Sequence, residues 1–432
     1  MSTTRRPDLV QFRIEPARDG LIHLVFDMPD RSMNVFSNAA IHELGRFSAW
    51  LKTSDVRGVV VRSGKSSAFC AGADLGELGV AYDMIMAAPS SDRFKVAFDH
   101  FFPLSQAIRG LETAGKPVAV AIAGLALGGG CELALGGHYR VLAHSPNAAL
   151  GLPESLVGLL PGAGGTQRLP RVIGIDAALP VLLGGVRLSG TEALNAGLVH
   201  QIVAPGQEVA AAEAWLLSDA VSAEQPWDRP DLTPPPMADI SKRVAIAREQ
   251  VLAETLGHEP APLAILNCIE QGLPLPFDQA IRKEMEIFSG LIQRAEARDM
   301  IRTLFHGKAD YERAKRKDVV PQGVSQAVET LLSLTEAARD AAPAPLAAAG
   351  FGKTGGDSSP VQTAVVEGYW LDGDDTDPRR REARDALESL AMTARDVARA
   401  LGETERRMVD YAVVVQGGFP AYLGGPIAFS TR

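Results

Sequence analysis

Cysteine and long apolar runs are both scarce in this sequence. Three cysteines occur in 432 residues (Cys70, Cys131 and Cys268), and their spacing fits neither a disulfide framework nor a zinc ribbon. We therefore expect a reducing compartment and no metal site. The longest apolar run, residues 117–131, is rich in glycine and ends at Glu132, short of the roughly 18 residues that suggest a membrane span. Because the N-terminus also has no apolar segment long enough for a signal peptide, we predict a cytoplasmic protein with no membrane span.

Acidic residues outnumber basic ones, 52 to 43. The formal net charge is −9, whereas a general nucleic-acid binder needs an excess of Lys and Arg to neutralise phosphates. We therefore expect no nucleic-acid partner. A small anionic ligand is not excluded, because a few local groups are enough to bind one.

Changes in composition divide the chain into five parts. A chain of 432 residues is too long for one ordinary core. In its first part, strand-like and helix-like patterns alternate, which indicates an α/β layer. Proline then marks a linker, and helical periodicity marks the segment after it. The expected parts are an α/β core over residues 1–220, a Pro-rich linker over 221–236, a helical subdomain over 237–320, a flexible Ala/Pro/Gly tether over 321–360 and a helical tail over 361–432.

Two stretches rich in small residues attract attention within the core. They read "SSAFCAGADLGEL" (66–78) and "AIAGLALGGGCELALGGHYR" (121–140), and each runs from a strand through small residues toward a helix. Small residues let a ligand approach the backbone closely, and free N–H groups at a helix start attract anionic oxygen. Two such turns, if they converge, make an oxyanion hole from backbone alone. The alternative is that the glycines only permit tight packing between strand and helix.

Two acidic residues lie in apolar surroundings nearby. Glu132 directly follows the glycines, and Glu154 lies in "LGLPESLVGLLPGAGGTQRLP". An unpaired carboxylate is costly in such surroundings and tends to take up a proton. Two neighbouring carboxylates in different environments can therefore supply one acid and one base near neutral pH. Pairing of each glutamate with Arg140 or Arg168 is the alternative, and the residues alone leave both interpretations open.

Four stretches, taken in order, resemble one known family. "AFCAGADL", "IAGLALGGGCELAL", "LGLPESLVGLLPGAGGTQRLPRVIG" and "GLVHQIV" are similar to motifs of the crotonase (enoyl-CoA hydratase/isomerase) superfamily, and the resemblance extends from about Leu9 to Ala204. It implies an α/β fold with a crotonase-type ββα spiral core, followed here by a helical C-terminal region. It further implies a site whose residues are assigned position by position.

The resemblance implies roles for residues of both glycine-rich turns. The backbone N–H groups of Ala73 and Gly129 would hold the thioester carbonyl as an oxyanion hole. Glu132 would orient and deprotonate the attacking water, while Glu154 would deliver a proton to Cα. The acyl-CoA site would be lined by Ala71, Ala73, Asp74, Leu75, Gly76 and Gly129. The segment between the two glutamates is about two residues longer than the family pattern, so we expect a widened loop around residues 143–147 that leaves both carboxylates in place.

The implied activity is that of an enoyl-CoA hydratase, a hydro-lyase of fatty-acid β-oxidation. It would add water across the trans-2 double bond of an acyl-CoA and need no cofactor, because CoA is part of the substrate. The alternatives are a Δ3,Δ2-enoyl-CoA isomerase or an acyl-CoA hydrolase of the same fold, or a non-catalytic CoA-binding assembly subunit. Single-domain relatives form trimers or dimers of trimers, which makes a homo-oligomer the expected state.

The second half resembles parts of multifunctional β-oxidation enzymes. "AEQPWD" and "RDMIRTLFHGKAD" resemble the region that follows their N-terminal hydratase half, and "RRMVDYAVVVQGGFPAYLGGP" (406–426) resembles the end of their 3-hydroxyacyl-CoA dehydrogenase. Between them, no strand leads into the Gly-x-Gly-x-x-Gly turn that NAD binding needs. We expect a fusion that lost its nucleotide-binding domain and kept a packing element. A separate 3-hydroxyacyl-CoA dehydrogenase or thiolase is then a candidate partner.

Overall fold

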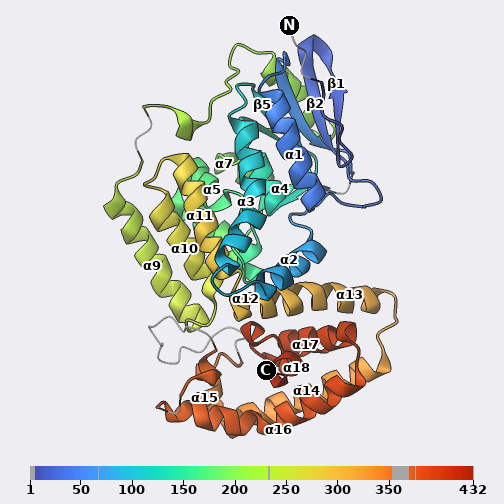
Figure 1. The fold of residues 1–432 in the computed structure, drawn as a ribbon, viewed down its shortest axis with the longest axis vertical. Helices are drawn as coiled ribbons and strands as arrows, with labels where there is room; N and C mark the ends of the chain where they lie inside the picture. Colours follow the sequence, from blue (N-terminus) through green and yellow to red (C-terminus); the bar gives the residue numbers. More distant parts are fainter. Residues whose placement is uncertain (1–4, 67, 232–233, 353–368, 375, 432) are drawn as a thin grey trace. The chain divides into compact units, whose positions relative to one another are not determined.

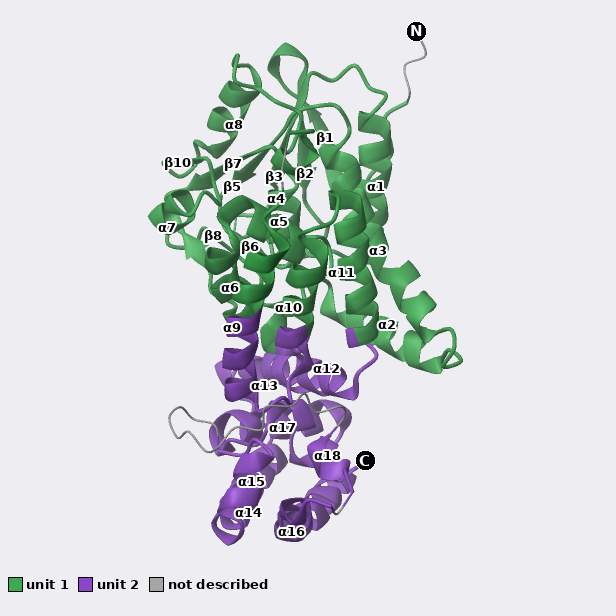
Figure 2. Cartoon of the chain, turned by 90° about the vertical axis from the view of Figure 1, so that its left-hand side faces the viewer, with its two compact units in different colours: residues 1–156, 160–244, 264–290 green, residues 157–159, 245–263, 291–432 purple. Residues whose placement is uncertain are grey.

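The computed structural model describes residues 5–66, 68–231, 234–352, 369–374 and 376–431 (Figure 1). The chain forms two compact units (Figure 2). Unit 1 comprises residues 1–156, 160–244 and 264–290, and unit 2 comprises residues 157–159, 245–263 and 291–432. The division falls within α9 (Met237–Thr255) and α10 (Pro260–Gly272), before the last residue of α11 (Phe277–Leu291), and on either side of residues 157–159.

The main sheet of unit 1 has six strands in the order β1-β2-β3-β5-β7-β10. β1 and β2 pair antiparallel, with Phe12 opposite Phe26, and the remaining neighbours pair in parallel. Parallel strands covered on both faces need near-continuous apolar sequence, and every residue of β5 is indeed buried. The strands are β1 (Phe12–Pro16), β2 (Leu21–Phe26), β3 (Gly58–Ser63), β5 (Val118–Ile122), β7 (Tyr139–Ala143) and β10 (Gln201–Val203).

A second sheet of four short strands accompanies the first, in the order β4-β6-β8-β9. Three times along the chain, a strand of the main sheet is followed by one of this sheet and then by helical residues. This repetition is the ββα spiral that the resemblance implied. Each repeat therefore delivers a turn at the end of a short strand, just before a helix. The strands are β4 (Ala68–Cys70), β6 (Leu125–Leu127), β8 (Ala149–Gly151) and β9 (Leu188–Ser189).

The helices α1 and α2 of unit 1 each begin at a capping residue whose side chain accepts a backbone hydrogen bond. Ser37 caps α1, where its side chain accepts a hydrogen bond from the Ala40 N–H, and Asp74 caps α2 in the same way. α1 and α3 lie side by side (Figure 1). Besides α9 and α10, the helices of unit 1 are α1 (Asn38–Leu51), α2 (Leu75–Ala87), α3 (Arg93–Glu112), α4 (Gly129–Leu135), α5 (Gly165–Ile173), α6 (Ile175–Gly184), α7 (Gly190–Asn195), α8 (Glu208–Leu216) and α11 (Phe277–Leu291).

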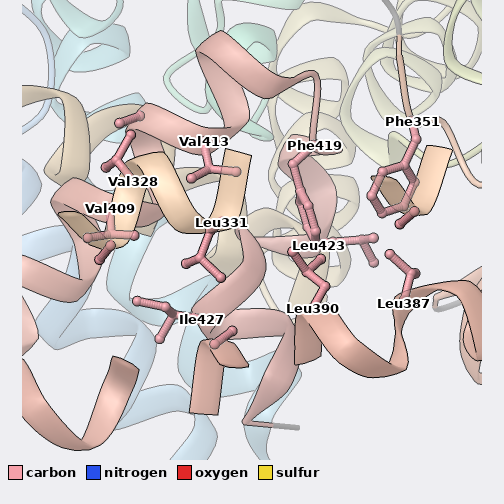
Figure 3. Close-up of a cluster of buried hydrophobic side chains, with 14 of the residues drawn as sticks. Val328, Leu331, Phe351, Leu387, Leu390, Val409, Val413, Phe419, Leu423 and Ile427 are labelled. Atoms are coloured by element: carbon pink, nitrogen blue, oxygen red, sulfur yellow. The ribbon is translucent and has the colours of Figure 1, made fainter. Parts of the chain in front are cut away.

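The described part of unit 2 is helical. α12 continues into a π-helical turn over Ile301–Gly307 and then into α13. The helices of this unit pack around one apolar cluster, to which α14, α16 and α17 all contribute (Figure 3). They are α12 (Ala295–Met300), α13 (Lys308–Arg316), α14 (Gln322–Ala341), α15 (Pro343–Ala348), α16 (Pro378–Ala400), α17 (Glu403–Gly417) and α18 (Pro426–Ser430).

The structure differs from the expectation of a flexible tether over residues 321–360. α14 fills much of this range, and its residues Val324, Val328 and Leu331 are buried in the cluster of unit 2. Their spacing of three to four residues marks an apolar helical face, which the high content of Ala, Pro and Gly obscured. Residues 353–360 lie outside the described part of the chain. The segment expected as a Pro-rich linker contains a short 3-10 turn, Pro226–Asp228, with Trp227 buried.

Candidate functional site

The first glycine-rich turn connects β4 to α2 and holds Ala73 at its surface. Gly72 adopts a φ of 101°, which favours glycine. The backbone of this turn pairs with Phe36: the Phe36 N–H donates to Gly72 O at 2.8 Å, and the Asp74 N–H donates to Phe36 O at 2.9 Å. The Ala73 N–H between them donates no hydrogen bond within the described residues. It is therefore available to a ligand.

The second glycine-rich turn connects β6 to α4. Gly128 has a φ of 52° and a ψ of −126°, and its N–H donates to Gly151 O at 3.0 Å. Gly129 is the first residue of α4, and helix-start N–H groups have no partner inside the helix. In the described part of the chain the Gly129 N–H donates to no other group either. This turn thus offers a second bare donor at a helix start.

The two turns lie against each other. A Cβ atom placed on Gly72 would lie 3.2 Å from Leu127 O, and one placed on Gly128 would lie 3.5 Å from the Cα of Gly72. Phe36 bridges them, because its backbone pairs with the Ala73 turn while its ring packs against Gly129, 3.0 Å from where a Cβ would be. The structure therefore brings the two predicted oxyanion donors into one place.

Glu132 projects from α4 into a buried position, with 2% of its surface exposed. Its Oε1 accepts hydrogen bonds from the N–H groups of Ala163 and Gly165, both at 2.7 Å. Burial raises the pKa of Glu132 to about 7, although the two backbone donors and the charge of Arg168 oppose the rise. Such a carboxyl group can exchange a proton near neutral pH.

Glu154 is the first residue of a 3-10 turn, Glu154–Val157, which follows β8, and its side chain reaches the second glycine-rich turn. Its Oε1 is 2.6 Å from where a Cβ on Gly128 would be. Its Oε2 is buried and has no hydrogen-bond partner among the described residues. Burial, followed by the charge of Glu132, raises the pKa of Glu154 well above its ordinary value. The two glutamates are thus close enough to influence each other, and their environments differ.

The arginines that could have paired with these glutamates are engaged elsewhere. Arg168 forms a bidentate ion pair with Glu112, with both N–O distances at 2.8 Å and both side chains fully buried. Arg140 donates to the carbonyl oxygens of Gly137 and Leu198. The purely structural interpretation, in which each glutamate has an arginine partner, therefore does not hold.

The residues expected to line an acyl-CoA site have other visible roles. The Asp74 carboxylate accepts from the N–H groups of Gly76 and Glu77, and it pairs with Arg31 at 2.8 Å. It is therefore occupied as the cap of α2, which Leu75 opens. Ala71 donates its N–H to Asn34 O. These residues hold the Ala73 turn in shape, and their contact with a ligand stays a prediction.

The connection expected to be widened runs between β7 and β8. It closes through hydrogen bonds from the Ser145 N–H to Ala143 O and from the Ala148 N–H to Ser145 O. Glu154 nevertheless reaches Gly128, so this loop leaves both carboxylates beside the turns. The cysteines Cys70, Cys131 and Cys268 are free and buried. In the described part of the chain, no cluster of His, Cys, Asp or Glu residues could hold a metal ion.

A third buried carboxylate, Glu284, belongs to this region and was not predicted. It projects from α11 and accepts from the N–H groups of Gly164 and Thr166. Burial, followed by the charge of Glu132, raises its pKa to about 8. The sequence carried a signal: Glu284 interrupts an otherwise apolar stripe on α11, formed by Phe277, Ile281, Phe288 and Leu291.

A cavity of about 750 Å³ on unit 1 is lined by other residues. Trp227 and Phe277, whose rings stack 4.9 Å apart, are among its lining residues. None of the predicted site residues lines it. Its walls are rich in proline and also carry charged residues, among them Asp176, Asp239 and Arg243.

Comparison with known proteins points to one family. A family model described as "Enoyl-CoA hydratase/isomerase" matches residues 17–225. The fatty acid oxidation complex subunit alpha of Shewanella frigidimarina is 33% identical over 306 residues, covering 70% of this chain and 41% of that protein. The subunit of the same name from Idiomarina loihiensis is 31% identical over 328 residues, covering 73% and 44%. The chain thus spans less than half the length of these curated relatives.

Solved structures are similar over part of the chain. A Bacillus anthracis enoyl-CoA hydratase is 24% identical with a TM-score of 0.41, and the match covers 72% of this chain and 98% of that one. Pseudomonas aeruginosa DspI is 28% identical with a TM-score of 0.42, covering 49% and 81%. No helix among the described residues is long and apolar enough to cross a membrane. Through residues 17–225, the chain belongs to the enoyl-CoA hydratase/isomerase (crotonase) family.

Proposed function

We propose that the chain is an enoyl-CoA hydratase that adds water across the trans-2 double bond of an acyl-CoA in fatty-acid β-oxidation. The thioester carbonyl would accept hydrogen bonds from the Ala73 and Gly129 N–H groups. Negative charge develops on this oxygen as water attacks, and preorganised donors stabilise that charge in the transition state. The support is the meeting of two turns that each present an unbonded N–H group.

Proton transfer falls to the two glutamates. Glu132 takes a proton from water as the oxygen bonds to Cβ, and Glu154 gives a proton to Cα as the enolate collapses to the thioester. Each turnover leaves Glu132 protonated and Glu154 ionised, so one proton must return to Glu154 before the next. The product is a 3-hydroxyacyl-CoA, with one water consumed.

The ground-state protonation of the pair suits these roles. The pKa of Glu132 is raised to about 7, whereas burial and the charge of Glu132 raise that of Glu154 well above its ordinary value. Because both pKa values are raised, the pair can take up a proton near neutral pH, as one acid and one base require. Because the two groups interact, the measured pKa values will belong to the pair.

The experiment is a hydration assay with purified protein. Crotonyl-CoA and longer trans-2-enoyl-CoAs are supplied, and loss of the enoyl absorbance is followed. We expect Glu132→Gln and Glu154→Gln each to lower kcat by about 100- to 10,000-fold, the usual contribution of general acid–base catalysis. Glu208→Gln is the matched control, because Glu208 is also buried and accepts from a backbone N–H, that of Gly206.

Two outcomes would count against hydration. Wild-type protein that leaves every enoyl-CoA unchanged while still binding acyl-CoA would indicate a non-catalytic subunit. Conversion of a 3-enoyl-CoA that survives Glu154→Gln would indicate an isomerase with a single proton-shuttling carboxylate.

The remaining parts of the proposal follow from the reaction. Hydration involves no net oxidation or reduction, and both proton-transfer groups belong to the chain, so we propose that it requires no added cofactor. We further propose a cytoplasmic location, a homo-oligomeric state and a functional link to a separate 3-hydroxyacyl-CoA dehydrogenase or thiolase. The link is supported by the names of the curated relatives, which are subunits of a fatty acid oxidation complex. Size-exclusion chromatography with light scattering tests the oligomeric state.

A further inference from the structure

The backbone N–H groups of the turn that opens α5 donate alternately to two carboxylates. Glu132 accepts from Ala163 and Gly165, and Glu284 accepts from Gly164 at 2.6 Å and Thr166 at 3.0 Å. Successive peptide planes of this turn are thus fixed from two different helices, α4 and α11. Consecutive donors would otherwise be the unsatisfied N–H groups of a helix start.

The backbone here is shaped for close approach of both side chains. Gly164 has a φ of 96°, and a Cβ there would lie 1.9 Å from Arg168 Nη1. A Cβ on Gly165 would lie 2.8 Å from Glu132 Oε1. Arg168 also donates to Ala163 O at 2.7 Å. The turn is therefore held from several directions.

Glu284 is itself held in place by a short polar chain. Thr166 Oγ1 lies 2.5 Å from Glu284 Oε2. The Gln167 side-chain amide donates to Thr166 Oγ1 at 3.0 Å and to Cys268 O at 2.9 Å. Glu284, Thr166 and Gln167 are all fully buried. A buried acid in an apolar helix stripe is costly unless it is hydrogen-bonded, and here all its shown partners belong to the turn that also binds Glu132.

We propose that Glu284 is a positioning residue for Glu132. By holding the Gly164 and Thr166 N–H groups, it directs the alternate N–H groups of Ala163 and Gly165 at Glu132 Oε1 and leaves the other oxygen of that carboxylate to meet water. This inference rests on the proposed hydration and deepens it. It extends the site to α11, outside the residues matched by the family model.

Several titratable groups interact with Glu284 and bear on how it affects the pKa of Glu132. Burial and the charge of Glu132 raise the pKa of Glu284 to about 8, which favours its neutral form at neutral pH. Replacing it with a neutral side chain therefore changes the donors around Glu132 more than it changes the local charge. Loss of ordered donors destabilises the ionised form of Glu132 and raises its pKa. The other titratable groups that interact with Glu284 are Glu154 on the turn after β8, Arg168 and Arg171 on α5 and Cys268 on α10.

The test compares Glu284→Met and Glu284→Gln with wild type. Met has similar length and no acceptor, so we expect kcat to fall about 10- to 100-fold, in line with the cost of misplacing a reacting group, with KM within about twofold because no contact to substrate is removed. The acidic limb of the kcat/KM profile should move to higher pH. Gln keeps one carbonyl oxygen, so Glu284→Gln should give an intermediate kcat and an intermediate shift of the acidic limb.

Glu43→Met is the matched control. Glu43 is also a buried carboxylate, and it accepts from the N–H groups of Val10, Gln11 and Phe12. Its loss should lower the free energy of unfolding and leave kcat and the pH limb unchanged. A folded Glu284→Met variant with wild-type kcat and an unmoved limb would overturn the inference.

A second pair of variants decides the matter if Glu284→Met does not fold. Thr166→Val replaces the hydroxyl that contacts Glu284 and the Gln167 amide with a methyl group, and we expect a smaller fall in kcat with a limb shift of the same sign. Thr166→Ser should retain more activity than Thr166→Val, and equal profiles for the two would overturn the inference. Failure of the proposed function looks different, because wild-type protein would then hydrate no enoyl-CoA at all.

Discussion

A methyl group added at Gly128 should strongly impair the proposed hydration. The N–H of Gly128 pairs with Gly151 O, and the backbone of this residue lies against Gly72. In Gly128→Ala the new Cβ would lie 2.6 Å from Glu154 Oε1, whereas ordinary van der Waals contact begins at 3.4 Å. The carboxylate must therefore withdraw by about 0.8 Å, the difference between these distances.

The expected losses of rate and of stability have separate causes. A displacement of about 1 Å in a reacting group costs roughly 100-fold in rate, so we expect kcat for hydration to fall by about that factor. The φ of 52° and ψ of −126° are also unfavourable for alanine, and such a backbone costs about 1–3 kcal/mol. Stability and activity should both decline.

A stopped-flow hydration assay and urea unfolding together separate the two losses. Gly115→Ala is the matched control, because Gly115 has a φ of 71° and nothing lies within 4 Å of its added Cβ. The control should lose stability while keeping wild-type kcat. A Gly128→Ala variant with wild-type kcat would refute the placement of Glu154 beside the reacting carbons.

Other perturbations test separate parts of the account. Arg168→Met leaves Glu112 buried without its bidentate partner, and urea unfolding should show a loss of about 3–5 kcal/mol; a loss under 1 kcal/mol would contradict this. The kcat/KM profile should rise as pH passes through about 7, because Glu132 must lose its proton to act as base, and ionisation of Glu154, whose pKa is raised above its ordinary value, should lower it; a flat profile would exclude this pair. Because the pKa of Glu132 is higher in the folded state, its contribution to the free energy of unfolding should decline as pH rises from 4.5 to about 7, and Glu132→Gln should remove this dependence on pH. Leu331→Ala opens a cavity in the unit 2 cluster and should lower the free energy of unfolding by about 2–5 kcal/mol; no change would mean that this cluster does not support the fold.

The sequence was most informative where structure is local. Apolar strands such as Val118–Ile122 and capping residues such as Ser37 act over a few positions, and their patterns predicted the α/β layer. The two glycine-rich turns were also recognisable, because short β-strands and positive φ angles need particular residues. Even so, the residues alone could not show that the turns meet, since that contact depends on pairing in the second sheet.

The parts that escaped prediction depend on contacts distant in sequence. Glu284 lies 120 positions from Gly164, whose N–H it accepts, and helix periodicity says only that α11 has an apolar face. The choice between an arginine partner and a free carboxylate was equally hidden, because Arg168 finds Glu112 on another helix. α14 was mistaken for part of a tether because it was grouped with the Ala/Pro/Gly-rich stretch that follows it, although alanine favours helices.

A crystal structure with a bound, unreactive acyl-CoA analogue would test the central claim most directly. The account predicts the thioester oxygen about 2.7–3.1 Å from both the Ala73 and Gly129 nitrogens, with Glu132 and Glu154 flanking the Cα–Cβ bond. A thioester bound elsewhere, or reached by only one of the two glutamates, would contradict it.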